Sequence, residues 1–142
     1  MFKHILIATD GSPLAAKGVR TGLRLANALG SKVTGLYVAF AYLPTSSLPG
    51  LSPRVLKRIS AEQAKKALGP LLAQARTAGV PCKTRTALAG EPWQAILRAA
   101  RAARCDAIVM ASHGRSAIGG LILGSETTHV LARARVPVLV VR

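Results

Sequence analysis

A glycine-rich stretch in the second half of the chain has residue types suited to holding a phosphate group. It reads VMASHGRSAIGGLILGSETT from Val109 to Thr128; an apolar run ends at Met110, and a helical pattern resumes after Gly124 and Ser125. A loop that opens a helix presents unpaired backbone N–H groups, and the helix dipole favours negative charge at the same place. We therefore expect a phosphate-bearing ligand at this loop.

The established catalytic signatures do not fit this loop. Gly114 and Gly119 have the Walker spacing, but Gly120 stands where the phosphate-binding lysine should follow. The dinucleotide pattern G-x-G-x-x-G is absent, and Ile118 occupies the second glycine position of a nucleophile elbow. On spacing alone, a purely structural turn is an equally good interpretation. We name no catalytic residue.

The stretch resembles the nucleotide-binding signature of the universal stress protein family, G-x2-G-x9-G-(S/T). Gly114 takes the place of the second glycine, and Gly124 and Ser125 follow after nine intervening residues. The ends of the chain, KHILIATDGS and RVPVLVVR, also resemble the family, so the resemblance covers nearly the whole chain. Ala111 stands where the first glycine is expected. Alanine would be strained there if the position needs a positive φ, and would serve if it needs only a small side chain.

Short apolar runs alternate with amphipathic helical patterns, and these are the elements that must position the loop. We expect strands at His4 to Ala8, Lys32 to Phe40, Cys82 to Leu88, from Asp106, and at Val136 to Val141. We expect helices from Pro13 to about Leu29, from Arg54 to Ala78 with a kink or break at Pro70, from Pro92, and from Ser125 to about Ala134. The segment Ala41 to Pro53 reads as a loop, and we assign it no chemistry.

This alternation predicts an α/β domain with one mostly parallel sheet covered on both faces. The basic residues of the third strand favour a position at a sheet edge. The family resemblance implies a single doubly wound domain over residues 1–142, with five parallel strands in the order 3-2-1-4-5. In such sheets ligands bind beyond the carboxyl ends of the strands where the winding reverses, here between Asp10 and the loop after Met110.

The resemblance also implies roles for individual residues around an adenine nucleotide, which we expect to be ATP, alone or with Mg²⁺. Contacts to adenine and ribose are implied for Ala8, Thr9, Asp10, Val38, Met110 and Ala111. Contacts to phosphate are implied for Gly114, Gly124, Ser125, Glu126 and Thr127, through backbone N–H and hydroxyl groups. The Glu126 side chain must then point away from the phosphates. Arg115 either neutralises phosphate charge or is one more solvated arginine.

Length and composition limit the classes of protein. A chain of 142 residues, half of them hydrophobic, has the size of one globular domain. Cys82 and Cys105 are far apart in the sequence and indicate neither secretion nor a structural metal. No apolar run approaches the ~20 residues that a membrane helix needs. We therefore expect a soluble, cytoplasmic protein without a metal site.

The charge balance raises a second function. Twenty Lys and Arg against five Asp and Glu give a formal net charge of +15, which attracts nucleic acid by counterion release. The basic residues are nevertheless spread along the chain, and aromatic residues, which stack on bases, make up only 4% of it. Compositional bias explains the charge as well, so nucleic acid is possible as a partner but not favoured.

Three functions follow, in order of preference. The first is a stress-response protein that binds ATP and signals through its bound state; the others are a slow ATP hydrolase and a basic nucleic-acid-binding protein. Hydrolysis needs a positioned water activator and usually carboxylates for a metal, and Asp10 is the one suitably placed acid. We further expect a homodimer in which Val136 to Val141 pair antiparallel across a two-fold axis, because an unpaired apolar terminal strand is an aggregation hazard. The family resemblance points to the same dimer.

Overall fold

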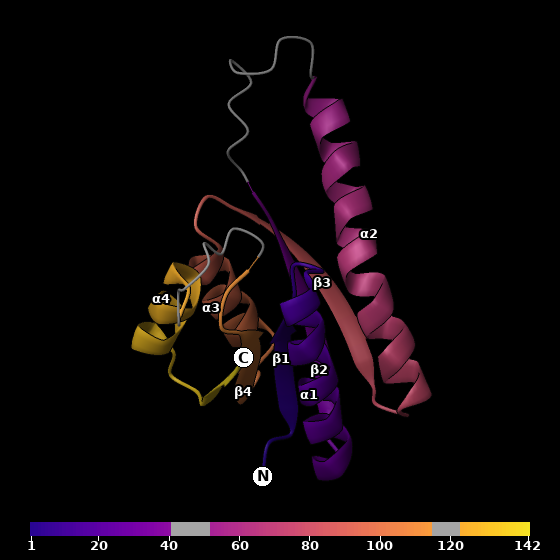
Figure 1. The fold of residues 1–142 in the computed structure, drawn as a ribbon, viewed down its shortest axis with the longest axis vertical. Coiled ribbons are helices and arrows are strands. Elements are labelled where there is room, and N and C mark those ends of the chain that lie inside the picture. Colours follow the sequence, from indigo (N-terminus) through magenta and orange to yellow (C-terminus); the bar gives the residue numbers. More distant parts are fainter. Residues whose placement is uncertain (41–51, 115–122) are drawn as a thin grey trace.

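Strands and helices alternate along the chain (Figure 1), and the computed structural model describes residues 1–40, 52–114 and 123–142. The strands are β1 (His4–Ala8), β2 (Lys32–Phe40), β3 (Cys82–Ala89), β4 (Ala107–Ala111) and β5 (Val138–Val141). The helices are α1 (Pro13–Leu29), α2 (Pro53–Thr77), α3 (Pro92–Ala102) and α4 (Ser125–Arg133). Within the described residues this is the alternation that the sequence predicts.

The strands form one parallel sheet in the order β3-β2-β1-β4-β5. Ile7 is a useful landmark, because it pairs with Gly35 on one side and with Val109 on the other. The α/β class and the strand order implied by the resemblance are therefore confirmed. So is the edge position of the third strand. The order also makes β1 and β4 neighbours at the centre of the sheet.

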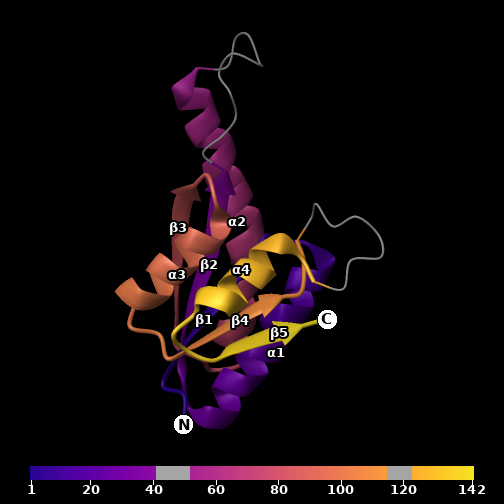
Figure 2. The same ribbon diagram turned by 90° about the vertical axis from the view of Figure 1, so that its left-hand side faces the viewer.

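Each face of the sheet is covered by two helices (Figures 1 and 2). Side chains alternate between the faces of a strand, so neighbouring residues of β1 enter different cores. Ile5 and Ile7 pack with residues of α1 and α2, whereas Leu6 packs with residues of α3 and α4. All three are fully buried, which explains why the strand reads as a continuous apolar run.

Of the kink or break expected at Pro70, the break is wrong, because α2 is one continuous helix from Pro53 to Thr77. Leu68 and Leu71, on either side of Pro70, are buried in the two cores beneath α2. Their burial holds the helix together across the missing proline N–H. The expected loop also ends earlier than Pro53, since Pro53 is the first helical residue and the Ser52 hydroxyl accepts a 3.4 Å hydrogen bond from Val55 N.

Two strands begin later than the sequence suggests. The last strand starts at Val138 instead of Val136; Pro137 only contributes its carbonyl, which accepts a 2.9 Å hydrogen bond from Ile108 N. Asp106 precedes β4 because its carboxylate accepts hydrogen bonds from the backbone N–H groups of Lys3 and His4, at 2.9 and 3.0 Å. Side-chain hydrogen bonds of this kind are invisible to hydrophobic periodicity.

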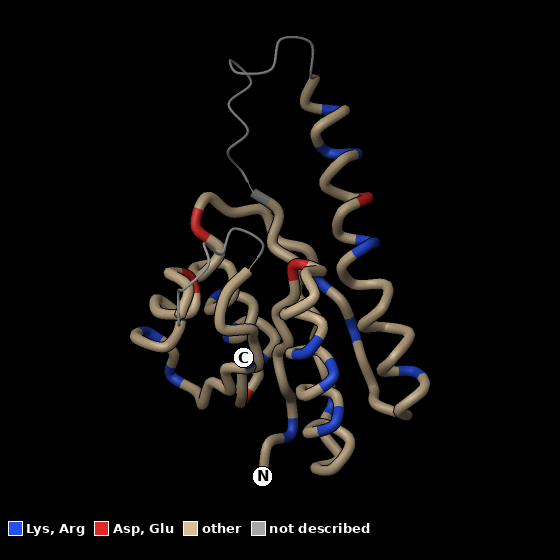
Figure 3. Tube along the Cα trace, in the orientation of Figure 1, with Lys and Arg blue, Asp and Glu red and all other residues tan. Residues whose placement is uncertain are grey.

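Charged residues cover the outer sides of the helices. Figure 3 shows Lys and Arg along α1, α2 and other elements, with few Asp and Glu between them. The positive charge is thus distributed around the domain and is not confined to one stripe. None of the helices in the described part of the chain is long and apolar enough to span a membrane.

Candidate functional site

The carboxyl ends of β1 and β4 lie side by side at one end of the sheet, because the two strands pair in parallel. Residues 8–10 follow β1 at this end, and residues 111–114 follow β4. Val38 lies at the same end, two residues beyond Leu36, the partner of Ala8 in β2. Met110 and Ala111 are buried at the end of β4, whereas Val38 and Ala8 are half-buried. The fold therefore brings both connecting loops together with six predicted site residues: Ala8, Thr9, Asp10, Val38, Met110 and Ala111.

The turn after β1 fixes the position of the Asp10 carboxylate. Gly11 adopts a left-handed φ of 78°, which allows the chain to reverse. Within this turn Ser12 N donates to Asp10 Oδ1 at 2.9 Å, and Gly11 N donates to Thr9 Oγ1 at 3.2 Å. The Ser12 hydroxyl then caps α1 by accepting from Ala15 N at 3.2 Å. Asp10 is consequently held at the start of α1 with a defined side-chain direction.

Gly114 lies directly against Asp10. A Cβ atom at position 114 would come within 2.7 Å of Asp10 Oδ2, closer than any normal contact. The described glycines with a left-handed φ are Gly11, Gly30 and Gly79, so Gly114 is not needed for a left-handed backbone. A side chain at position 114 would displace the Asp10 carboxylate, so glycine there keeps this carboxylate in its place.

Ala111 is accommodated without strain. It is the last residue of β4, pairs with Val141 of β5, and is 8% exposed. Arg104 is the one described residue other than glycine with a positive φ. Of the two alternatives left open by the sequence, the position therefore needs a small side chain and not a left-handed backbone. The departure from the family signature costs the loop nothing in backbone conformation.

Ser112 ties the loop after β4 to the start of α4. Its carbonyl oxygen accepts hydrogen bonds from Gly124 N at 2.7 Å and from the Thr127 hydroxyl at 3.0 Å. The same hydroxyl also donates to the Ala111 carbonyl at 3.0 Å, and Thr127 is 1% exposed. The Thr127 hydroxyl is therefore engaged with the loop. Its backbone N–H is the group of Thr127 that can serve a ligand at the helix terminus.

The N-terminus of α4 faces the carboxyl ends of β1 and β4, and it has no side-chain cap. Gly124 is the N-cap residue, and Thr128 N makes the first intrahelical hydrogen bond, 3.0 Å to Gly124 O. The N–H groups of Ser125, Glu126 and Thr127 precede that bond, and the helix dipole adds partial positive charge. Gly124 is packed tightly, since a Cβ atom there would lie 3.2 Å from both His113 Cα and Ser112 O. An anion can bind here through backbone groups.

Glu126 points its carboxylate away from the loop. Its Oε2 accepts a 2.6 Å hydrogen bond from Trp93 N in the first turn of α3, where the N-cap residue Glu91 makes no side-chain cap. The Glu126 carboxylate thus caps a neighbouring helix, which removes its negative charge from the anion-binding end of α4. This is the direction that phosphate binding by the backbone of residues 124–127 requires.

One site residue that the sequence analysis missed is Ser112. It is 2% exposed, its carbonyl closes the loop, and its hydroxyl lies 3.2 Å from His113 Nδ1. The available signal was its place as the first polar residue after a buried strand. Arg115, which was considered for phosphate, lies outside the described residues. Within those residues, no group of three or more His, Cys, Asp or Glu side chains could hold a metal ion.

Comparisons with known proteins identify the family of this chain. The family model described as "Universal stress protein family" matches residues 1–142. A universal stress protein from Thermus aquaticus is 39% identical, with all of both chains covered. A universal stress protein structure from Lactobacillus plantarum is 25% identical with a TM-score of 0.81, covering 99% of this chain and 97% of that one. A universal stress protein from Archaeoglobus fulgidus, solved in complex with dAMP, shares the fold at 20% identity and a TM-score of 0.70, covering 100% and 98%.

Proposed function

The chain belongs to the universal stress protein family, and from this premise we propose that it binds an adenine nucleotide, ATP, at the carboxyl ends of β1 and β4. The function of the protein is then to signal in the stress response through its nucleotide-bound state. The observation that carries the proposal is that Gly114 leaves room for the Asp10 carboxylate. This contact lies beside the N-terminus of α4, which has no side-chain cap. A related protein of the same fold holds dAMP.

The two ends of the site suit the two ends of a nucleotide. Asp10 offers a carboxylate that accepts a hydrogen bond from a ribose hydroxyl, and Val38 offers backbone atoms to the adenine edge. The phosphates extend from there past Gly114, which adjoins Asp10, to the backbone N–H groups at the start of α4. The exposed part of Met110 and Ala111, 6% and 8% of their surface, flanks the nucleoside.

Binding, and not rapid hydrolysis, is the function that this site supports. Two acidic side chains of the site are described, Asp10 and Glu126, and the carboxylate of Glu126 is bound to Trp93 N. A Mg²⁺ ion that accompanies ATP would be held chiefly by the phosphates, with the Asp10 carboxylate as a protein ligand. Titrations of the protein with ATP, with and without EDTA, test whether ATP binding depends on Mg²⁺.

Thermal unfolding with ATP tests the proposal. Ligand at ~100 times its Kd stabilises a folded protein by about 2.7 kcal/mol. The unfolding entropy of a 142-residue domain is about 0.3 kcal/mol per K, so the Tm should rise by about 9 °C. AMP and cAMP are measured alongside ATP to identify the nucleotide. No shift with any of the three at millimolar concentration would refute nucleotide binding.

Two glycine variants make the test specific. Gly114→Ala must displace the Asp10 carboxylate, so it should weaken ATP binding by about 10-fold or more, the loss of one charge-assisted hydrogen bond. Gly69→Ala is the matched control, because a Cβ atom there meets nothing within 4 Å. Ala111→Gly should leave the affinity within about twofold, since Ala111 is unstrained. Equal affinities for the Gly114 and Gly69 variants would contradict the proposed ligand position.

We also propose that the protein is a homodimer through β5. This strand is at the sheet edge, and Leu139 in it is 41% exposed. Leu139→Lys should give monomers, whereas Leu131→Lys, at a similarly exposed position of α4 (43%), should not. Light scattering that finds wild-type monomers at micromolar concentration would exclude the dimer.

The expected location is the cytoplasm. Cys82 and Cys105 are free thiols, and free thiols are usual in the reducing cytosol. ATP as the ligand favours the same compartment. Cell fractionation with an antibody against the protein tests this expectation directly.

A further inference from the structure

A groove between α2 and the edge strand β3 lies apart from the proposed nucleotide site at the carboxyl ends of β1 and β4. It has a volume of about 770 Å³, and its walls are mostly apolar. Leu56, Leu68 and Leu72 line it from α2, and Leu88, which is 67% exposed, lines it from β3. The α2 lining extends from Pro53 to Leu72, which is a length of ~28 Å at 1.5 Å per residue. This length suits an extended chain.

The groove runs beside an open sheet edge. β3 pairs with β2 alone in the five-stranded sheet, through eight residues from Cys82 to Ala89 (Figure 2). Its outer edge therefore carries backbone N–H and C=O groups that have no strand partner within the described residues. An edge of this length is a template for one further strand.

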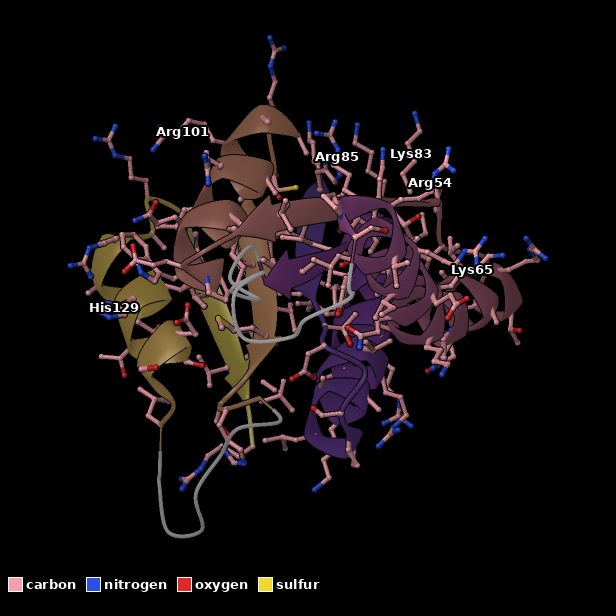
Figure 4. The ribbon with its side chains drawn as sticks, turned by 90° about the horizontal axis from the view of Figure 1, so that it is seen from above. Arg54, Lys65, Lys83, Arg85, Arg101 and His129 are labelled. Atoms are coloured by element: carbon pink, nitrogen blue, oxygen red, sulfur yellow. The ribbon has the colours of Figure 1, made fainter. Side chains whose placement is uncertain are left out.

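The two faces of β3 differ in chemistry. Thr84, Thr86 and Leu88 line the groove on the α2 side. Lys83 and Arg85 alternate with them, so they belong to the opposite face, and both are exposed. Figure 4 shows Lys83 and Arg85 pointing in the same direction, away from the sheet. A strand beside β3 would thus meet an apolar groove on one face and two cations on the other.

We propose that this edge binds an extended segment of a partner protein as an additional strand, in which apolar and acidic residues alternate. The apolar side chains fill the groove beneath α2, and the Asp or Glu side chains lie beside Lys83 and Arg85. Backbone hydrogen bonds to β3 hold the segment, and the side-chain pattern selects it. This surface is independent of the proposed nucleotide site.

Charge identifies the occupant as acidic. Lys83 and Arg85 place two exposed cations on the face of β3 opposite the groove, where the acidic side chains would lie. The net charge of +15 attracts an acidic segment from a distance. A second copy of this chain does not fit, because its two closest acidic residues, Glu91 and Asp106, are 15 positions apart (106 − 91). Lys83 and Arg85 repel the basic copies and so leave the edge open for an acidic partner.

A short peptide tests this proposal directly. The probe is a fluorescein-labelled peptide of eight residues, the length of β3, in which valine and glutamate alternate. Fluorescence anisotropy in 0.15 M salt should give a Kd on the order of 10–100 μM, typical of a weak peptide contact. The matched peptide with lysine in place of glutamate should not bind. Absence of binding by the glutamate peptide at millimolar protein would refute the proposal.

Paired variants locate the site. Lys83→Glu combined with Arg85→Glu should weaken peptide binding by at least about 10-fold, because both cross-strand pairs become repulsive. Arg20→Glu combined with Arg24→Glu on α1 changes the charge equally and should alter the Kd by less than about twofold. Circular dichroism establishes that both variants are folded. Equal losses in the two variants would mean that net charge, and not this edge, attracts the peptide.

Two competitors distinguish strand addition from other occupants. A peptide methylated on every backbone nitrogen has no N–H group to donate to β3 along either edge and should not bind. If it binds as well as the parent peptide, the groove accepts an apolar chain without strand pairing, and the proposal is wrong. A single-stranded oligonucleotide that displaces the peptide stoichiometrically would likewise overturn it, since the surface would then be a nucleic-acid site.

Discussion

Among the described residues, the Thr127 hydroxyl is the side-chain group that ties the start of α4 to the end of β4. It donates to the carbonyl oxygens of Ala111 and Ser112, both at 3.0 Å, from a side chain that is 1% exposed. Thr127→Val keeps the shape of the side chain and removes the donor. The Ser112 carbonyl still accepts from Gly124 N, so the Ala111 carbonyl suffers the larger loss.

The expected cost follows from the burial of these groups. A buried acceptor that loses its partner costs about 1–3 kcal/mol, and the added methyl group offsets little of that. With an unfolding entropy of about 0.3 kcal/mol per K for 142 residues, the Tm should fall by about 3–10 °C. The start of α4 should also be less rigidly placed, so ATP binding should weaken together with stability.

Urea unfolding monitored by circular dichroism measures this cost. Thr128→Val is the matched control: it is the same substitution at the next position of α4, where the hydroxyl donates to Gly124 O at 3.0 Å but the residue is exposed. This control should stay within about 0.5 kcal/mol of the wild type. If Thr127→Val is as stable as Thr128→Val, the buried hydroxyl does not anchor the loop and the reasoning fails.

Three further predictions concern residues away from the site. Burial, together with the charge of Asp106, raises the pKa of Cys105 from 9.0 to about 11. The thiolate fraction at pH 8 is then ~100-fold lower, and alkylation by iodoacetamide should be slower than that of free cysteine by at least this factor. Burial and the nearby Lys32 lower the pKa of His4, so the unfolded chain binds more protons. The free energy of unfolding should therefore fall as the pH drops below about 6.5, and less so in His4→Gln; equal slopes would exclude His4 as the cause. Pro70→Ala should raise the free energy of unfolding by about 1–3 kcal/mol, because it restores an N–H donor inside the continuous helix α2, and a lower urea midpoint would contradict this.

Much of the fold could be predicted because its causes are local. Ser12, Pro13 and Gly30 bound α1 where the sequence places its ends, since capping depends on residues within one turn of the helix terminus. The apolar runs gave every strand to within two residues for the same reason. The strand order came from the family resemblance, because periodicity does not specify which strands are neighbours.

The candidate site was found in outline from the glycine signature, which is a pattern within one stretch of sequence. The physical reason for its glycine was not found. Gly114 lacks a side chain because Asp10 occupies that space, and Asp10 comes from the opposite end of the chain. That contact joins two loops far apart in the sequence, so no pattern within either stretch indicates it.

The sequence by itself determined the alternation of strands and helices, the helix caps and the glycine-rich loop, because each of these depends on residues close together in the chain. The tertiary structure alone decided that Glu126 caps α3 through Trp93, that Thr127 anchors the end of β4, and that α2 continues past Pro70. It also decided that an apolar groove lies between α2 and the edge strand β3. The physical reason is common to all four: hydrogen bonds and packing between distant segments exist only after the sheet has assembled, and no local pattern encodes them.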